Sequence, residues 1–276
     1  MELAVLAHVG IFDSGLGGLT VARALRARAP ALPILYLGDT ACFPYGGQSP
    51  AELEARVLVV GQSLVDRGCT ALVVACNTAT SAALERLRAE LPVPVIGMEP
   101  PLKPAAEQTK SRRVIVLATA GTAAGERFAR LEADHAVGVT VHTVPMPGLA
   151  DLIEAGRARD PQVLAMLEQA IREPIALGAD AVALGCTHYG FVAAPLRTLL
   201  PEHVAIIDAA DAVARRTLAV LEGVAQHVTA GAVRPVDYDV TGDRRAFAAA
   251  VDCLRDVGET LPALANIRRR LATVGS

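Results

Sequence analysis

Short apolar runs alternate with longer amphipathic stretches along most of this 276-residue chain. The runs have the length of buried strands, and the stretches carry apolar residues at the three- and four-residue spacing of helices. Such alternation is typical of an α/β fold, in which helices connect parallel strands. The predicted strands are residues 9–12, 34–37, 71–75, 93–97, 114–117, 139–144, 181–184, 204–207 and 236–240. The predicted helices are residues 19–28, 51–67, 81–91, 122–132, 161–177, 194–200, 209–221 and 247–254.

The chain also contains an internal repeat. Residues 68–78 align without a gap with residues 178–188. Both blocks read as a turn, a buried strand and then a cysteine at the carboxyl end of that strand, Cys76 in the first block and Cys186 in the second. The repeat predicts two similar α/β domains with parallel central sheets, related by a pseudo-twofold axis, with the active site between them.

A proline-rich segment, residues 99–104, is the expected boundary between the two domains, because proline interrupts both helices and sheets. We predict a first domain of residues 1–99 plus 208–276 and a second domain of residues 100–207. The segment after residue 208 is expected to return to the first domain.

Composition excludes several classes of protein. Hydrophobic residues make up 52% and the net charge is −3, which excludes a disordered chain and predicts no binding of nucleic acid or an anionic membrane. The apolar runs are shorter than the ~18 residues of a membrane span. Residues 1–12 lack the features of a signal peptide and are interpreted as a strand. We therefore expect a cytoplasmic protein with its five cysteines reduced. The arginines at 268–270 are interpreted as the solvated end of a helix.

Ligands of open α/β sheets bind beyond the carboxyl ends of the strands. Segments rich in glycine, hydroxyl and acidic side chains follow the predicted strands at residues 13–18, 38–40, 75–78, 118–122 and 185–188. Gly15 and Gly17 fit a dinucleotide fingerprint, but Thr20 stands where its third glycine belongs. The simplest alternative for this loop is a glycine turn in which Asp13 or Ser14 caps the next helix.

Cys76 and Cys186 are the candidate reactive groups, because the repeat makes them equivalent. Each is expected at a helix N-terminus, which lowers the pKa of a thiol. A ligand between the two domains then has one thiol on each face. A racemase needs this arrangement, because one base removes the α-proton while a second group protonates the opposite face. The alternative is that both thiols are small buried hydrophobes.

Few residues in the sequence are candidates for binding a metal or another cofactor. Cys186 and His188 are close in the sequence, but no second cluster completes a metal site. A pyridoxal enzyme needs a lysine for its Schiff base, and Lys103 and Lys110 both lie near the predicted linker. We therefore expect neither a metal nor another cofactor.

A series of motifs resembles the glutamate racemases of the cofactor-independent aspartate/glutamate racemase superfamily. They are FDSGLGG (12–18), YLGDT…PYG (36–46), ACNTAT (75–80), ATAGT (118–122), PGLADLIEAG (147–156), GCTHY (185–189) and VTGD (240–243). The resemblance implies a cytoplasmic enzyme, usually a homodimer, that interconverts L- and D-glutamate without a cofactor. It also implies that the D-glutamate supplies peptidoglycan synthesis.

The resemblance further implies a role for particular residues. Cys76 and Cys186 are similar to the two catalytic acid/bases, Asp13 to the carboxylate that assists the first, and Glu154 with His188 to the pair that assists the second. The positions similar to substrate-binding residues are Asp13, Ser14, Tyr45, Gly46, Asn77, Thr78, Thr119, Thr122, Thr187 and His188. The positions that depart from common family residues include Cys42, Gln48, Met146 and Gly190.

Other functions stay open at this stage. The motif spacing does not fix the length of the substrate side chain, so a racemase of aspartate or of another amino acid is the nearest alternative. A nucleotide-binding oxidoreductase would use residues 13–18. A non-catalytic binding protein would use the same fold without the chemistry of the two cysteines.

Overall fold

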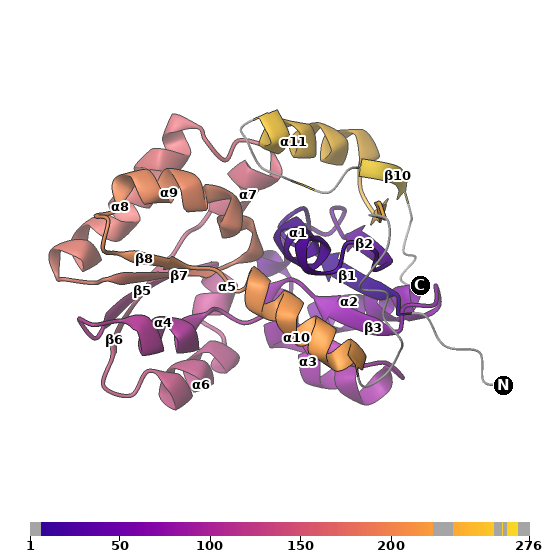
Figure 1. The fold of residues 1–276 in the computed structure, drawn as a ribbon, viewed down its shortest axis with the longest axis horizontal. Coiled ribbons are helices and arrows are strands. Elements are labelled where there is room, and N and C mark those ends of the chain that lie inside the picture. The colour runs from indigo at the N-terminus through magenta and orange to yellow at the C-terminus, as the bar shows by residue number, and fades with distance from the viewer. Residues whose placement is uncertain (1–6, 223–233, 257–260, 262–263, 270–276) are drawn as a thin grey trace.

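The structure, a computed structural model, describes residues 7–222, 234–256, 261 and 264–269. These residues form two parallel sheets with helices packed around them (Figure 1). The predicted strand at residues 1–12 falls partly outside the described residues, and its described part begins at Val9. No helix in these described ranges has both the length and the apolar character needed to cross a bilayer.

The first sheet has the strand order β10-β9-β2-β1-β3-β4, and all its pairings are parallel. Its strands are β1 (Val9–Asp13), β2 (Ile34–Gly38), β3 (Ala71–Val74), β4 (Val95–Gly97), β9 (Val236–Val240) and β10 (Leu264–Arg269). The helical segments that accompany it are α1 (Leu19–Arg28), the 3-10 helix η1 (Tyr45–Gly47), α2 (Pro50–Val65), α3 (Asn77–Glu90), α10 (Ala210–Glu222) and α11 (Arg244–Asp256).

Alternate residues of this sheet face different helices, as the two-residue period of a strand requires. Ile11 and Val73 share a core cluster with Leu25 of α1, whereas Phe12 and Val74 pack with residues of α2 and α3. Both faces of the sheet are therefore covered, which explains why its strands read as continuous apolar runs.

The second sheet has the order β6-β5-β7-β8 and is also parallel throughout. Its strands are β5 (Arg113–Ala118), β6 (Thr140–Pro145), β7 (Ala181–Gly185) and β8 (Ala205–Ile207). Helices α8 and α9 lie over one face and α4 and α6 over the other (Figure 1). The helical segments of this part are α4 (Leu102–Gln108), α5 (Ala120–Ala123), α6 (Glu126–His135), α7 (Leu149–Glu154), α8 (Pro161–Ala176), η2 (Thr187–Val192) and α9 (Ala193–Leu199).

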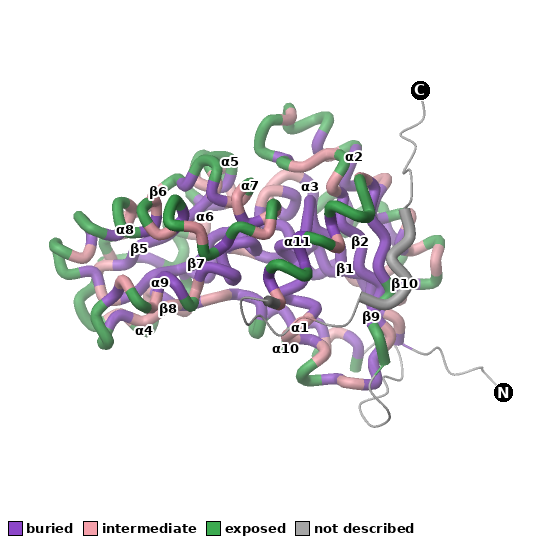
Figure 2. The backbone as a smooth tube through the Cα atoms, turned by 90° about the horizontal axis from the view of Figure 1, so that it is seen from above, coloured by how far each residue is buried: buried purple, intermediate pink, exposed green. Residues whose placement is uncertain are grey.

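The internal repeat extends to the strand order. The series β2-β1-β3-β4 in the first sheet corresponds, strand for strand, to β6-β5-β7-β8 in the second. In both sheets the central strands are buried, while exposed residues gather on the surrounding helices and loops (Figure 2). The predicted α/β fold with two parallel sheets is confirmed, and the domain boundaries themselves stay a prediction.

Two local predictions were wrong. Residues 268–269 belong to a parallel edge strand, β10, and not to the end of a helix, while residue 270 lies outside the described part of the chain. Charged residues are common on edge strands, so an arginine run does not by itself distinguish the two structures. The helix predicted at 122–132 is divided into α5 and α6 by Gly125, whose backbone is extended where α6 begins.

Candidate active site

One small pocket lies where the carboxyl ends of both sheets approach each other. Its volume is about 100 Å³. It is lined by loops that follow β1, β2 and β3 of the first sheet and β5, β6 and β7 of the second. The lining residues are Ser14, Phe43, Pro44, Tyr45, Gly46, Cys76, Asn77, Thr78, Thr119, Ala120, Met146, Pro147, Gly148, Ala150, Asp151, Cys186, Thr187 and His188.

The structure brings most of the predicted site residues to this pocket. Asp13, Glu154 and Thr122 do not line it but contact residues that do. Asp13 accepts a hydrogen bond from Thr187 Oγ1 (2.9 Å). Glu154 bonds His188, and Thr122 Oγ1 accepts from Thr119 Oγ1 (3.0 Å). These three residues thus lie behind the residues that line the pocket.

Cys76 stands at the junction of β3 and α3. Its backbone is still extended, and α3 begins at the next residue, so the thiol becomes the N-cap of the helix. The Ala79 backbone N–H donates to Cys76 Sγ (3.5 Å), and the thiol donates to Ser14 Oγ (3.9 Å). The side chain is nevertheless nearly enclosed, at 6% exposure.

Burial dominates the protonation of this thiol. Burial and then the nearby charge of Asp13 raise the pKa of Cys76 to about 12, although the Ala79 N–H acts in the opposite direction. The helix N-terminus lowers the pKa of this thiol as predicted, through the Ala79 N–H, but burial outweighs it, so the pKa is raised and not lowered overall. The physical reason is one of magnitude, because a helix terminus contributes roughly 1 kcal/mol while full burial shifts a pKa by as much as about 3–5 units.

This raised pKa gives an expected result for thiol modification. At pH 8 a thiol with a pKa of about 12 is ionised in roughly one molecule in ten thousand. The rate of Cys76 alkylation by iodoacetamide should therefore keep rising by about tenfold per pH unit between pH 8 and 10. Peptide mass spectrometry measures this rate, with a free cysteine peptide in the same tube as the control. A plateau for Cys76 at or below pH 9 would contradict it.

Cys186 stands at the equivalent junction after β7 and has a different partner. Its Sγ lies 3.9 Å from Nδ1 of His188, and the other ring nitrogen of His188 is 2.8 Å from Glu154 Oε2. Burial by itself would lower the pKa of His188, but its bonds to the thiol and to Glu154 hold that pKa well above its usual value. The imidazole is thus favoured in its charged form beside the Cys186 sulfur.

Asp13 ends β1 and joins the two halves of the site. Its carboxylate accepts from the Gly15 backbone N–H (2.8 Å) and, across the pocket, from Thr187. Burial raises the pKa of Asp13, partly offset by the charge of His188. The alternative that Asp13 or Ser14 caps α1 was wrong, since Gly18 is the N-cap and no side chain bonds there.

Asn77 contributes a buried polar group to the pocket lining. Its side-chain amide is buried, and neither Nδ2 nor Oδ1 has a hydrogen-bond partner among the residues that the structure describes. An unpaired buried amide is costly, so such a group calls for a partner supplied from outside the chain. The amide offers one donor group and one acceptor for a ligand in the pocket.

Sequence reasoning missed Phe43 as a pocket residue. Its ring lies 5.4 Å from the ring of His188, with the two planes inclined by 39°. Phe43 directly precedes the PYG residues (44–46) of a motif that resembles the racemase family, and this position was the only available sequence signal. Its contact with a residue from the other sheet, however, leaves no trace in local sequence.

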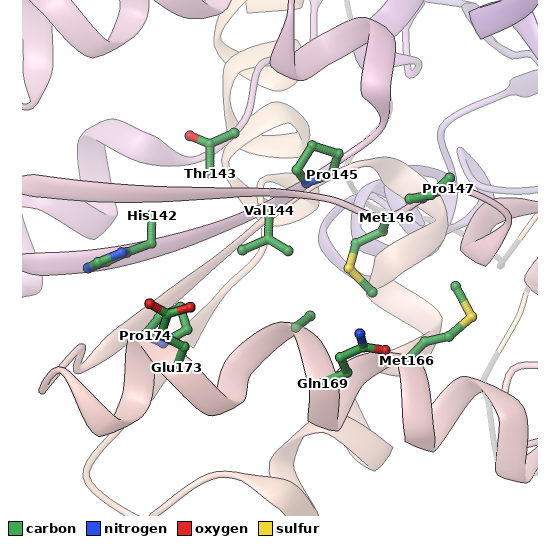
Figure 3. Close-up of a pocket in the computed structure, with 11 residues that line it drawn as sticks. His142, Thr143, Val144, Pro145, Met146, Pro147, Met166, Gln169, Glu173 and Pro174 are labelled. Carbon is green, nitrogen blue, oxygen red and sulfur yellow. The ribbon is translucent and has the colours of Figure 1, made fainter.

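A larger groove lies between β6 and α8. It has a volume of about 560 Å³, and its lining side chains come from both elements (Figure 3). Among the described residues that line the groove, Glu173 is the acid and His142 the base, and none is a cysteine, lysine or arginine. Met146 and Pro147 line both cavities. The candidate chemistry lies in the smaller pocket, where thiols, hydroxyls and the Asn77 amide converge.

Known proteins resemble this chain over most of its length. The sequence pattern of the Asp/Glu/Hydantoin racemase family matches residues 19–217. The chain belongs to this racemase family. Membership makes it an isomerase, which removes the oxidoreductase and the non-catalytic binding protein from the alternatives.

Individual members of the racemase family are similar over most of the chain. The glutamate racemase of Pseudomonas aeruginosa is 46% identical, covering 83% of this chain and 87% of its own. That of Ralstonia pickettii is 43% identical, covering 97% and 89%. The crystal structure of Escherichia coli glutamate racemase with L-glutamate and the activator UDP-MurNAc-Ala has a TM-score of 0.83 at 29% identity, covering 95% of this chain and 98% of that one.

Proposed function

We propose that this racemase interconverts L- and D-glutamate by a two-base mechanism, with Cys76 and Cys186 on opposite faces of the substrate. The observation that carries the proposal is the placement of two thiols, equivalent in the internal repeat, in one pocket. Each thiol has its own ionisable neighbour, Asp13 for Cys76 and His188 for Cys186.

The proposed steps balance without an added reactant. The thiolate of one cysteine takes the α-proton, so that the C–H bond breaks, an S–H bond forms and the electron pair stays on the α-carbon. The thiol of the other cysteine then gives its proton to the opposite face. From D-glutamate, Cys76 is the base and Cys186 the acid, and the roles exchange for L-glutamate. The resting Cys76 is protonated and thus ready to act as the acid.

The neighbouring groups support these two roles. A charged His188, held by Glu154, places its Nδ1 3.9 Å from the Cys186 sulfur. Asp13 is the charged neighbour of Cys76, fixed by the Gly15 N–H and the Thr187 hydroxyl, and burial raises its pKa above the ordinary value.

Several polar groups support an amino dicarboxylate as the substrate. Hydrogen-bond donors for two carboxylates come from one amide and four hydroxyl groups. The amide is that of Asn77, which is unpaired. The hydroxyls are those of Ser14 and Thr187, on the two sides of the pocket, and of Thr78 and Thr119, whose Oγ1 atoms lie 3.4 Å apart. The Tyr45–Gly46 segment forms a further wall. The similarity to glutamate racemases favours glutamate over aspartate, which is the second candidate substrate.

The proposal also covers the cofactor requirement, the compartment and the oligomeric state of the enzyme. It includes no metal, pyridoxal phosphate or nucleotide cofactor, since the chemistry above uses only groups of this chain. It also includes a cytoplasmic homodimer that supplies D-glutamate to peptidoglycan synthesis, as the resemblance to the racemase family implies.

Circular dichroism of glutamate tests the proposed function directly. Protein dialysed against a chelator and a carbonyl-trapping reagent should bring the signal of pure L-glutamate to zero, and that of D-glutamate equally. A panel of enantiopure amino acids, with aspartate first, serves as the specificity control. An unchanged glutamate signal, or one that changes only after a cofactor is added, would contradict the proposal.

A further inference from the structure

Two of the sequence motifs meet at a buried carboxylate outside the pocket. Asp39, which follows β2 in the motif at 36–46, is completely buried. It accepts from Arg56 of α2 through Nε (2.8 Å) and Nη2 (2.5 Å), so the guanidinium binds both of its oxygens. Thr241, from the motif at 240–243, donates to Asp39 Oδ1 (2.7 Å), and the Tyr45 hydroxyl donates to Oδ2 (2.7 Å).

This network is electrostatically complete. Burial alone would raise the pKa of Asp39, but its hydrogen bonds, that from Arg56 foremost, hold it below its ordinary value. A buried ion pair stays in place only when its remaining hydrogen-bonding positions are filled, and here two hydroxyls fill them. Asp39 is therefore a fixed anchor that joins α2 to the loops after β2 and β9.

Tyr45 connects the anchor to the pocket. Its hydroxyl is directed to Asp39 and is thereby occupied, while Tyr45 and its neighbours line the pocket. We call residues 43–46 the pocket wall. At its other end the wall rests on the second half of the site, because the Phe43 ring packs against His188.

We propose that Asp39 and Arg56 are positioning residues, which hold the Tyr45 hydroxyl and so fix the pocket wall against His188 and around the substrate. The kinetic part of this inference rests on the proposed glutamate racemisation. Neither residue lines the pocket, so neither touches the substrate in this arrangement.

A matched pair of variants separates positioning from simple stabilisation. Tyr45→Phe and Thr241→Val each remove a buried hydroxyl that donates to Asp39 at 2.7 Å. Only Tyr45 belongs to the pocket wall. Thr241 also accepts a hydrogen bond from the Ala41 N–H (3.1 Å), so the replacement of Thr241 is the harsher structural change.

We expect Tyr45→Phe to raise the KM for glutamate by about tenfold with kcat changed less than about threefold. Thr241→Val should lower Tm and leave KM within about twofold. Equal KM effects of the two variants, or none, would overturn the proposal.

Arg56 gives a second test through coupling. Arg56→Met should raise KM as Tyr45→Phe does, Arg56→Lys should restore part of the loss, and the double variant should be no worse than either single variant. Additive KM effects would show that Arg56 does not act through Tyr45. If Arg56→Met does not fold, Arg56→Lys is combined with Tyr45→Phe and judged by the same criterion.

Thiol access provides a readout that does not depend on racemisation. A loosened wall exposes the pocket, so Tyr45→Phe should accelerate the alkylation of Cys76 by at least about threefold, while Thr241→Val should not. If the wild-type protein fails to racemise glutamate, the proposed function is wrong, and this rate still decides the positioning role. Unchanged alkylation in Tyr45→Phe would then overturn it.

Discussion

Cys186→Ala is expected to abolish racemisation of glutamate in both directions while leaving slow exchange of the α-proton of D-glutamate. In the proposed two-base mechanism each direction needs one base and one acid, so the loss of either thiol should slow both directions by at least about a thousandfold. Cys76 remains able to remove the α-proton of D-glutamate and to return a solvent-derived proton to the same face. Circular dichroism measures the racemisation, and proton NMR in heavy water measures the exchange.

The mirror experiment completes this test. Cys76→Ala should exchange the α-proton of L-glutamate only, because Cys186 then remains as the single base. Cys253→Ala is the control, since that thiol is exposed on α11 and away from the pocket lining. Substantial racemisation by either active-site variant would replace the two-base mechanism with a one-base mechanism.

Gly17→Ala is expected to lower kcat/KM by about a hundredfold while the protein still folds. A methyl group at this position would lie 2.4 Å from Nδ1 of His188 and 2.5 Å from Oγ1 of Thr187. Both neighbours are buried, so they cannot swing away as an exposed side chain would. The methyl group therefore pushes His188 away from Cys186 and separates the two sides of the site.

The measurement pairs steady-state kinetics with thermal unfolding. Gly47→Ala is the matched control, because a methyl group there meets no atom within 4 Å. It should retain wild-type kcat/KM. If Gly17→Ala keeps full activity, the close packing of its loop on His188 is not required for catalysis. The prediction would also be contradicted if Gly17→Ala lost activity only because the protein unfolds.

Much of the fold was predictable because its signals are local or repeated. Buried parallel strands give continuous apolar runs, and the repeat around Cys76 and Cys186 placed two thiols at equivalent strand ends. The rule that ligands bind at the carboxyl ends of parallel strands then selected the loops that line the pocket. Glu154 came from the family resemblance alone, since nothing in its own neighbourhood distinguishes it from a surface acid.

Other features depend on contacts between distant segments and could not be predicted. The raised pKa of Cys76 follows from burial beneath loops of both sheets, which outweighs the helix terminus visible in the sequence. The partners Asp39 and Arg56 stand 17 residues apart without a periodic relation, and their third partner, Thr241, is about 200 residues away. The contact of Phe43 with His188 likewise joins the two sheets.

The unequal neighbours of the two thiols lead to a constraint on every variant of this enzyme. Cys76 is flanked by a carboxyl group and Cys186 by an imidazole, yet enantiomers in water have equal free energy. The ratio of kcat/KM between the two directions is therefore unity, however one flank is altered. Damage beside His188 must slow D-glutamate as much as L-glutamate by this measure. The difference between the flanks can be observed only in how kcat and KM divide for each enantiomer, and in how often a proton returns to the face that it left.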